Sequence, residues 1–306
     1  MGERMSRLKK YLIIISMILF TVFGFTALYI YRALHKACSR ATHAICEQKR
    51  AAYYKELVSR HNVEEVTLAT SDGIAISGLL LVRPKAKRVL LMCHGYRQSK
   101  EFLAPLADIF TDDTLLMIDF RAHGASGGTV ISWGYDEALD VEAAAAFLAQ
   151  DIRTKNLILY GMGFSMGTAA LVKAAQATPF KGLILDSGFA VLEEQARRFF
   201  TQATGLPQIA HCVSQYFYMF CMRRTVTMVN TCQILKKLTI PVLIIHSEED
   251  KTVPVQDAFE LYSCIRSKKE LWIVQGSSHV GIYKTYPEEY KAKVSSFLHS
   301  IEANKH

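Results

Sequence analysis

From about residue 63 onward, the hydrophobic positions form short continuous runs separated by segments with a helical pattern. The runs are rich in Val, Ile and Leu and have the length of strands: 88–93, 114–120, 156–160, 182–186, 241–246 and 271–275. Continuous runs of this kind are typical of strands buried on both faces of a mostly parallel sheet. Helical patterns lie between them, including 136–150 and 286–302. The alternation predicts an α/β domain.

Two segments depart from this rhythm. Before the first run, the extended segments 64–70 and 74–82 flank Ser-Asp-Gly, and an Asp-Gly turn between extended segments predicts a hairpin. Over fifty residues separate the runs 182–186 and 241–246, too many for a simple crossover. We expect the insertion, at about 188–238, to form a helical cap over the edge of the sheet where ligands bind.

The N-terminal region has a different pattern. Residues 11–31 contain no charge over 21 positions, and a helix of that length spans about 30 Å, the thickness of a bilayer's hydrocarbon core. A cleaved signal peptide and a buried helix are the alternatives, but no clean cleavage site follows, and an apolar helix without a polar face is uncommon in a domain of this size. The segment predicts a single-pass membrane anchor after a basic tail, 1–10. Residues 32–62 are expected to form a helical stalk or a solvated linker.

The formal net charge of +8 raises the question of a nucleic-acid partner. Nine Lys and Arg but only two acidic residues lie within 1–50, so the remaining 256 residues carry a balance of only +1. A nearly neutral domain lacks the basic surface that neutralises phosphates, and nucleic acid is not an expected partner. Basic residues flank the apolar segment almost equally, so the side of the membrane that holds the domain stays open.

The seven cysteines are scattered and form no C-x-x-C pair. They indicate neither a disulfide framework nor a zinc site, and no metal is expected. The redox compartment and the oligomeric state stay open.

The segment GMGFSMGTAA, residues 161–170, joins an apolar run to an alanine-rich helical pattern. It does not fit a phosphate-binding loop. In the G-x-G-x-x-G motif the third glycine would stand at position 166, which is Met166, and the lysine that a Walker motif requires is absent from this segment. Gly163, Ser165 and Gly167 instead satisfy G-x-S-x-G, in which a serine occupies a sharp turn between a strand and a helix. Small residues are needed on either side because the backbone is tightly folded there. We therefore predict a nucleophilic serine at 165.

A serine hydroxyl needs a general base, and the base needs a carboxylate that orients it. In folds with this serine turn, the acid and the base follow in the order Ser, Asp, His, each beyond a late strand. The penultimate apolar run is followed by Glu248, Glu249 and Asp250, and the last run is followed by His279. We expect His279 to accept the proton of Ser165 and Asp250 to hold the imidazole in the required tautomer.

Acyl transfer also requires donors for the oxyanion of the tetrahedral intermediate. The backbone N–H of Met166, directly after the serine, is one candidate. The second is expected from the loop after the run 88–93, where Gly95 lets the backbone turn inward and the N–H of Tyr96 follows.

These residues resemble the α/β-hydrolase superfamily, and within it the serine-aminopeptidase-like and esterase-like branch that often carries an N-terminal membrane anchor. The resemblance covers about residues 63 to 303 and runs through HGY (94–96), DFRAHGASGG (119–128), GFSMG (163–167), HSEEDKTVP (246–254) and GSSH (276–279). It implies an α/β-hydrolase fold for 63–306, Asp250 as the acid, and a structural rather than catalytic role for the turn at 119–123.

Two positions depart from the family pattern. Ala122 stands where the D-x-R-G-H-G motif has its first glycine, and Ser247 stands where a glycine usually precedes the acid. The second departure keeps Glu249 open as an alternative acid, and Asp186, at the end of an earlier run, is a more distant one.

The sequence thus predicts a membrane-anchored serine hydrolase that cleaves an ester, thioester or amide through an acyl-enzyme, with no cofactor. A small-molecule or lipid-like ester is favoured, because the cap carries aromatic residues and the arginines Arg197, Arg198, Arg223 and Arg224. Such aromatic clusters also commonly pack onto the domain beneath them. The alternatives are an aminopeptidase-like peptidase and a catalytically silent binding or scaffold protein. The acyl chain, the leaving group and any movement of the cap stay open.

Overall fold

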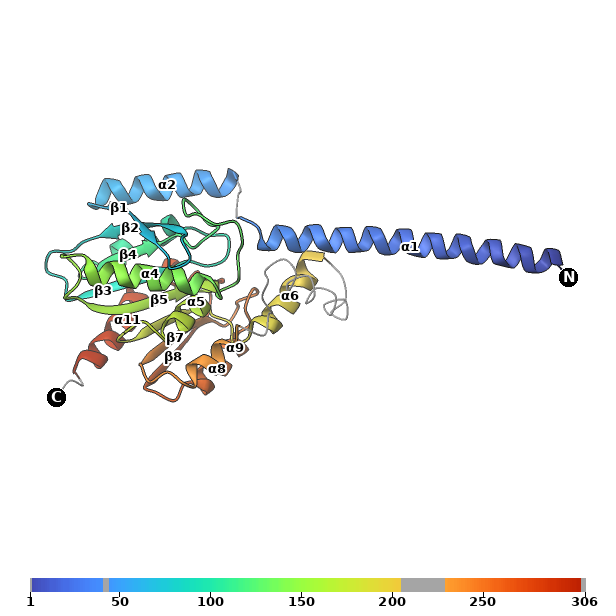
Figure 1. Ribbon diagram of the computed structural model, residues 1–306. Coiled ribbons are helices and arrows are strands. Elements are labelled where there is room, and N and C mark those ends of the chain that lie inside the picture. The colour runs from blue at the N-terminus through green and yellow to red at the C-terminus, as the bar shows by residue number, and fades with distance from the viewer. Residues whose placement is uncertain (1, 41–43, 205–228, 304–306) are drawn as a thin grey trace.

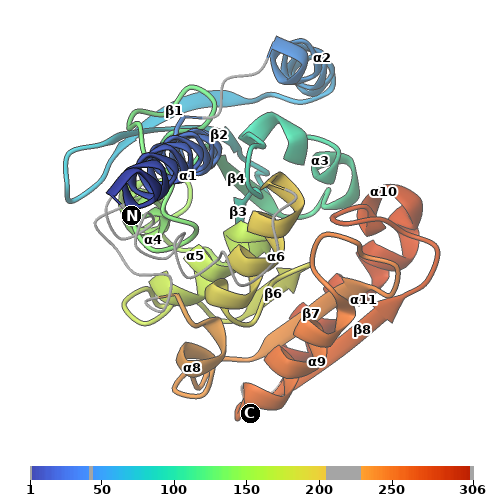
Figure 2. The same cartoon turned by 90° about the vertical axis from the view of Figure 1, so that its right-hand side faces the viewer.

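The computed structural model describes residues 2–40, 44–204 and 229–303. Its centre is an eight-stranded sheet with the order β1-β2-β4-β3-β5-β6-β7-β8 (Figures 1 and 2). β2 is antiparallel to both of its neighbours, and the strands from β4 to β8 pair in parallel. The strands are β1 Glu64–Ala69, β2 Ala75–Leu81, β3 Arg88–Cys93, β4 Thr114–Ile118, β5 Ile158–Phe164, β6 Leu183–Asp186, β7 Val242–Ser247 and β8 Lys269–Val274.

Helices cover both faces of the sheet. They are α1 Gly2–Cys38, α2 Ala44–Arg60, the 3₁₀ helix η1 Lys100–Leu103, α3 Leu106–Ile109, α4 Glu137–Gln150, α5 Met166–Ala174, α6 Leu192–Thr204, α8 Thr231–Leu235, α9 Val255–Cys264, α10 Ile282–Thr285 and α11 Pro287–Glu302. α4, α5, α8 and α9 pack on one face, and α2, η1, α3, α10 and α11 pack on the other. The prediction of an α/β-hydrolase fold is confirmed, and every predicted run overlaps a strand.

Both faces are apolar because successive side chains of a strand point to opposite sides. Along β3, Val89 and Leu91 belong to one core, whereas Leu90 and Met92 belong to the other. All four are at most 1 % exposed. This double burial explains why the strands read as continuous apolar runs rather than as alternating ones.

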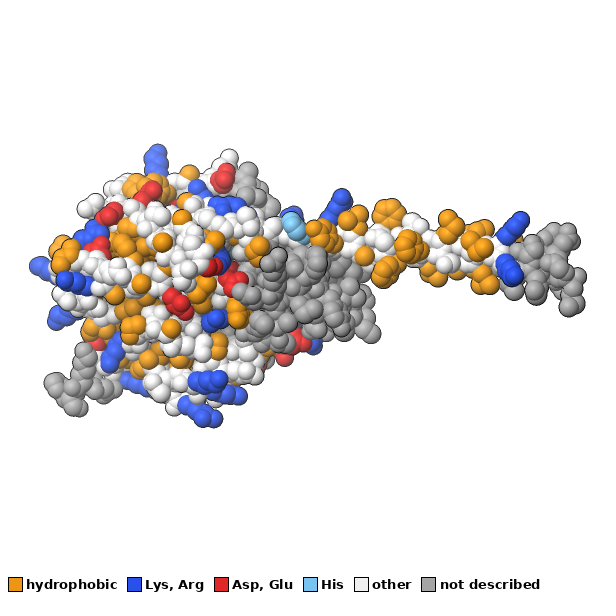
Figure 3. Space-filling view, viewed as in Figure 1, with side chains coloured by type: hydrophobic (Ala, Val, Ile, Leu, Met, Phe, Trp, Pro, Cys, Tyr) orange, Lys and Arg blue, Asp and Glu red, His pale blue; other side chains and the backbone are white. Residues whose placement is uncertain are grey.

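The N-terminal helix α1 projects from the domain (Figure 1). Within it, residues Lys9–Tyr29 have a mean hydropathy of 2.3 and are unburied, which makes this helix a candidate membrane span. Its apolar side chains cover the projecting part, with basic side chains near both ends (Figure 3). Its length and composition suit a membrane span and a signal sequence alike.

Residues 32–62, expected to be a stalk or linker, are largely helical, and their second half lies against the domain. α2 packs on η1, with Leu57 only 2 % exposed in the core beneath it. Arg60 and His61, which follow, both pair with Asp108 at 2.9 Å. α2 is therefore a layer of the domain, separate from the projecting part of α1.

The insertion follows β6, the sixth strand, as predicted. α6 begins it and α8 ends it. Residues 205–228 lie outside the described residues, together with the aromatic cluster 216–222, Arg223 and Arg224.

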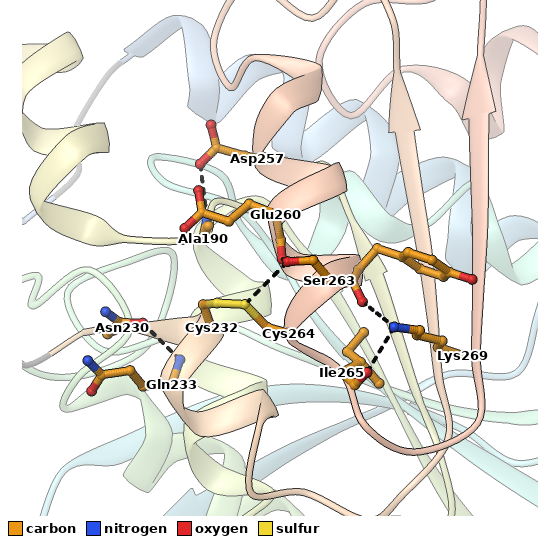
Figure 4. The surroundings of a disulfide bond; sticks show 11 residues. Ala190, Asn230, Cys232, Gln233, Asp257, Glu260, Ser263, Cys264, Ile265 and Lys269 are labelled. Carbon is orange, nitrogen blue, oxygen red and sulfur yellow. Dashed lines mark hydrogen bonds between the residues drawn. A yellow bond between two sulfur atoms is a disulfide. The ribbon is translucent and has the colours of Figure 1, made fainter.

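A disulfide joins Cys232 of α8 to Cys264 of α9, whose Cα atoms are 5.4 Å apart (Figure 4). The scattered cysteines did not indicate this pair, because it depends on two helices that the fold brings side by side. Cys93, at the end of β3, is a buried free thiol.

Candidate active site

Ser165 occupies the turn between β5 and α5. Its backbone has φ 51° and ψ −118°, a conformation that is strained for a side chain other than glycine. A Cβ added at Gly163 would lie 2.8 Å from the carbonyl oxygen of Gly167, and one added at Gly167 would collide with the carbonyl oxygen of Cys93. The two glycines thus allow the strand, the turn and the helix to approach closely enough to hold Ser165 in this conformation.

Three side chains meet at this turn, from three different loops. His279 Nε2 lies 2.9 Å from Ser165 Oγ, and His279 Nδ1 lies 2.6 Å from Asp250 Oδ2. Because a carboxylate only accepts, the Nδ1–H donates to Asp250 and leaves Nε2 free to accept from the serine hydroxyl. The structure therefore brings together the three residues that the sequence predicts, in the predicted order.

Asp250 is held for this purpose by its own turn. Its Oδ1 accepts the N–H groups of Thr252 at 2.8 Å and Val253 at 2.9 Å, so that Oδ2 faces His279. Burial acts to raise the pKa of the carboxyl, but the hydrogen bond and charge of His279 and the two N–H groups outweigh it. The pKa of Asp250 accordingly lies below its usual value, which keeps the carboxylate charged.

Glu249, the alternative acid, has a different partner. Its Oε2 accepts the N–H of Gly276 at 2.9 Å, and Ser247 Oγ lies 3.3 Å from the same oxygen. The backbone hydrogen bond from Gly276 lowers the pKa of Glu249. Glu249 therefore braces the loop that carries His279, and Asp250 is the carboxylate that contacts the imidazole.

Asp186, the more distant alternative, is connected to the loop of His279 through Ser187. Its Oδ1 accepts the hydroxyl of Ser187 at 2.8 Å, and Ser187 Oγ accepts the N–H of Val280 at 3.2 Å. Tyr290 donates to the second oxygen, Oδ2, at 2.8 Å. Burial raises the pKa of Asp186 to about 6. The carboxyl group thus positions the backbone next to His279 without contacting its ring.

The backbone segments that carry the two expected oxyanion donors both adjoin Ser165. Met166 is the first residue of α5, and the first N–H groups of a helix have no partner within it. The loop that carries Tyr96 approaches from β3: a Cβ added at Gly95 would lie 3.2 Å from Cβ of Ser165. Both backbone segments therefore border the serine, as the sequence predicts, and their part in binding an oxyanion stays a prediction.

The turn at 119–123 is hydrogen-bonded to Lys100 and to His94, the residue that precedes Gly95. Asp119 accepts from Lys100 Nζ at 2.6 Å, and His94 Nε2 accepts the N–H of Phe120 at 3.1 Å. Burial lowers the pKa of His94 to about 4, so this imidazole stays neutral and acts as a fixed acceptor. Ala122 has φ 58°, which explains why a glycine is usual at this position.

No three His, Cys, Asp or Glu side chains are grouped as metal ligands within the described residues.

Comparison with known protein families identifies the family of the chain. The model of the Alpha/beta hydrolase family matches residues 90–292, more than half of the chain. The chain belongs to the alpha/beta hydrolase family.

Individual relatives agree with this assignment. The uncharacterized protein YqkD of Bacillus subtilis is 26 % identical over 239 residues, which covers 76 % of this chain and 78 % of the relative. The human alpha/beta hydrolase domain-containing protein 17B is 27 % identical over 262 residues, which covers 82 % of this chain and 81 % of the human protein. Among solved structures, the Pyrococcus furiosus esterase Pf2001 has a TM-score of 0.67 at 25 % identity, covering 80 % of this chain and 93 % of that one. The family and its esterase members support a hydrolase.

Two of the arginines that favoured a lipid-like substrate, Arg197 and Arg198, lie in the described part of the insertion of this alpha/beta hydrolase, and both have acidic partners. Arg198 Nη1 donates to Asp257 of α9 at 2.7 Å, and Arg197 pairs with Glu193 one turn earlier in α6. Arg198 thus fastens α6 to the domain. Phe199 packs edge-on against the rings of Tyr96 and Trp133.

The sequence did not predict the roles of Ser247 and Trp133, which contact the loops of His279 and Tyr96. Ser247 Oγ donates to the carbonyl oxygen of Ser277 at 2.5 Å, which ties the end of β7 to the loop of His279. The departure from the family's glycine at 247 was the available signal. Trp133 carried no signal, because its loop reaches the site only through the fold.

Proposed function

We propose that the chain is a serine hydrolase that cleaves a carboxylic ester through an acyl-enzyme. The observation that carries the proposal is the hydrogen-bonded series from Ser165 through His279 to Asp250, at 2.9 and 2.6 Å. The relation to an esterase structure supports an ester rather than a peptide as substrate.

In this mechanism His279 Nε2 takes the proton of Ser165 Oγ as the oxygen attacks the carbonyl carbon of the ester. Asp250 stabilises the imidazolium that forms. The N–H groups of Tyr96 and Met166 would donate to the oxyanion, and each such donor lowers the barrier by about 2.7–4 kcal/mol. His279 then returns the proton to the departing alkoxide, and a water molecule, activated by the same nitrogen, hydrolyses the acyl-serine.

The test is labelling with a fluorophosphonate, which reacts with activated serines, followed by hydrolysis of a series of p-nitrophenyl esters. The full chain in detergent is compared with Ser165→Ala and His279→Ala. Loss of label and of ester hydrolysis in both variants is expected. An unlabelled wild-type protein that is folded by circular dichroism would refute the proposal, and aminoacyl amides cleaved in preference to esters would refute the choice of substrate.

We further propose that α1 anchors the enzyme in a membrane and that the substrate is lipid-like. α1 contacts α6, and Arg97 donates to the carbonyl oxygen of Lys36 in the last turn of α1 at 2.7 Å. Arg40, two residues beyond the end of α1, donates to three carbonyl oxygens within 124–128. α1 and α6 lie on the same side of the domain in both ribbon views (Figures 1 and 2). A bilayer crossed by α1 would therefore lie near the edge that carries Ser165.

Anchoring is tested by carbonate extraction of membranes and by the intact mass of the retained protein. Ile14 and Leu19 are 52 % and 64 % exposed, so lysines there leave the domain undisturbed. Each lysine in the middle of a span opposes insertion by about 2.5–3.5 kcal/mol. We expect full-length wild-type protein in the membrane pellet and the doubly substituted protein in the supernatant. A mature protein that lacks residues 1–31 would instead identify a signal sequence.

The disulfide between Cys232 and Cys264 supports a location of the domain outside the cytoplasm, because disulfides persist in oxidising compartments. Alkylation of these thiols in intact cells only after reduction is the expected result. Alkylation without reduction would place the domain on the cytoplasmic side.

A further inference from the structure

The loop between β4 and α4 holds a tryptophan in a conformation that its side chain disfavours. Trp133 has φ 57°, in the left-handed region, where a bulky residue is strained. The buried carboxylate of Glu137 fixes the residues on either side: it accepts the N–H of Ser132 at 2.7 Å, the hydroxyl of Ser132 at 2.6 Å and the N–H of Gly134 at 2.7 Å. Strain of this kind persists only where the surrounding structure holds it, and it clusters at functional sites.

Two contacts place this loop beside the nucleophile. The Trp133 ring stacks on the ring of Tyr96, with centroids 4.3 Å apart, and Tyr96 follows the glycine that borders Ser165. A Cβ added at Gly134 would lie 2.8 Å from Cβ of Ala169, which is one helical turn beyond Ser165. The loop is therefore packed against the first turn of α5, where the site lies.

Trp133 also has an unused donor. The residue is only 6 % exposed, and its Nε1–H has no hydrogen-bond partner in the described part of the chain. A buried tryptophan N–H usually has a partner, and a buried donor that is left unsatisfied destabilises the fold. The donor lies within an aromatic group completed by Phe199 of the cap, whose ring centroid is 5.3 Å from that of Trp133.

We propose that Trp133 is a substrate-contacting, specificity-determining residue. Its ring, with those of Tyr96 and Phe199, forms an apolar wall for the acyl chain of the ester, and its Nε1–H donates to an oxygen of the substrate. This inference rests on the proposed function, since it requires an ester at Ser165. It assigns the preference for an apolar acyl group to the β4–α4 loop together with the cap.

The chain contains two tryptophans, which makes the contact measurable by fluorescence. Trp272 lies on β8 and packs against Tyr290, with ring centroids 6.1 Å apart. Trp272→Phe leaves Trp133 as the only tryptophan, and Trp133→Phe gives the matched protein in which only Trp272 reports. Both full-length proteins are labelled with a fluorophosphonate that carries a long alkyl chain, and mass spectrometry gives the extent of labelling at Ser165.

We expect labelling to shift the emission of the Trp272→Phe protein by several nanometres and to leave that of Trp133→Phe unchanged. Stoichiometric labelling with no change in the emission of Trp133 would overturn the contact while the proposed function stands. A protein that takes no label at all would overturn the proposed function and the inference with it.

Kinetics test the hydrogen bond separately. Trp133→Phe retains an aromatic ring and removes the N–H, so kcat/KM for a long-chain p-nitrophenyl ester should fall about three- to tenfold, the usual effect of one lost hydrogen bond. Trp272→Phe should stay within twofold of wild type. A Trp133→Phe enzyme with wild-type kcat/KM would show that Nε1–H does not bind the substrate.

Discussion

Replacement of Asp250 by asparagine tests the series of hydrogen bonds most directly. The two backbone donors from Thr252 and Val253 hold Oδ1, at 2.8 and 2.9 Å. In Asp250→Asn these donors require the amide oxygen at that position, so the amide NH₂ must face His279. It would then donate to Nδ1, and the imidazole proton would move to Nε2.

The expected fall in kcat follows from this reversed tautomer. With a proton on Nε2, His279 cannot accept from Ser165, although the 2.9 Å geometry is otherwise kept. A carboxylate-to-amide exchange that reverses the tautomer in this way lowers kcat by about 10⁴-fold, which corresponds to roughly 5.5 kcal/mol of activation free energy. Binding of substrate should change little, because Asp250 is buried behind the imidazole.

Glu249→Gln is the matched control, since it removes the neighbouring negative charge and keeps an acceptor for Gly276. We expect its kcat to stay within about threefold of wild type. Both variants are measured by hydrolysis of a p-nitrophenyl ester and by the rate of fluorophosphonate labelling, after circular dichroism shows that they fold. If Asp250→Asn kept more than a tenth of the activity while Glu249→Gln lost most of it, the assignment of the acid would be wrong.

Three further changes are expected to act on stability, each measured by urea unfolding. Gly167→Ala should destabilise the domain by about 1–3 kcal/mol and abolish labelling, because the added Cβ meets the carbonyl oxygen of Cys93; an unchanged midpoint would contradict this contact. Burial raises the pKa of Asp186 to about 6, so its penalty to folding grows as the pH rises between about 4 and 6 and is complete above 6. Wild type should therefore lose about 2 kcal/mol of stability relative to Asp186→Asn between pH 4 and 7, and a pH-independent difference would refute this. The disulfide closes a loop with a sequence separation of 32, so the double substitution Cys232→Ser with Cys264→Ser should lower the free energy of unfolding by about 3–4 kcal/mol. If the bond itself is responsible, reduction of the wild-type protein must lower its stability by the same amount, and a smaller effect of reduction would contradict this.

The strands and the tight turn that holds Ser165 were predictable because their signals are local. A strand buried on both faces needs a continuous apolar run, and a serine on a tight turn needs glycine two residues away on either side. The acid and the base could be placed because each follows a late strand, and parallel strands end at one edge of the sheet. Even so, the choice between Asp250 and Glu249 needed the structure, since the two are adjacent in the chain and differ only in which way the turn after β7 directs them.

The position of α2, in contrast, could not be predicted from a local pattern. Its sequence reads as a polar helical linker, and only Leu57 and its neighbours on one face reveal that it covers η1. A short apolar stripe can belong to a stalk or to a surface helix, and periodicity does not distinguish the two.

The amino-acid sequence alone was sufficient for the α/β-hydrolase fold, the apolar N-terminal segment and the positions of Ser165 and His279, because each follows from a local pattern of apolar runs, turns and the residues after a strand. The disulfide between α8 and α9, the bracing of the His279 loop and the stacking of Trp133 on Tyr96 came from the fold. These depend on contacts between segments far apart in the chain, which packing creates and no local pattern records.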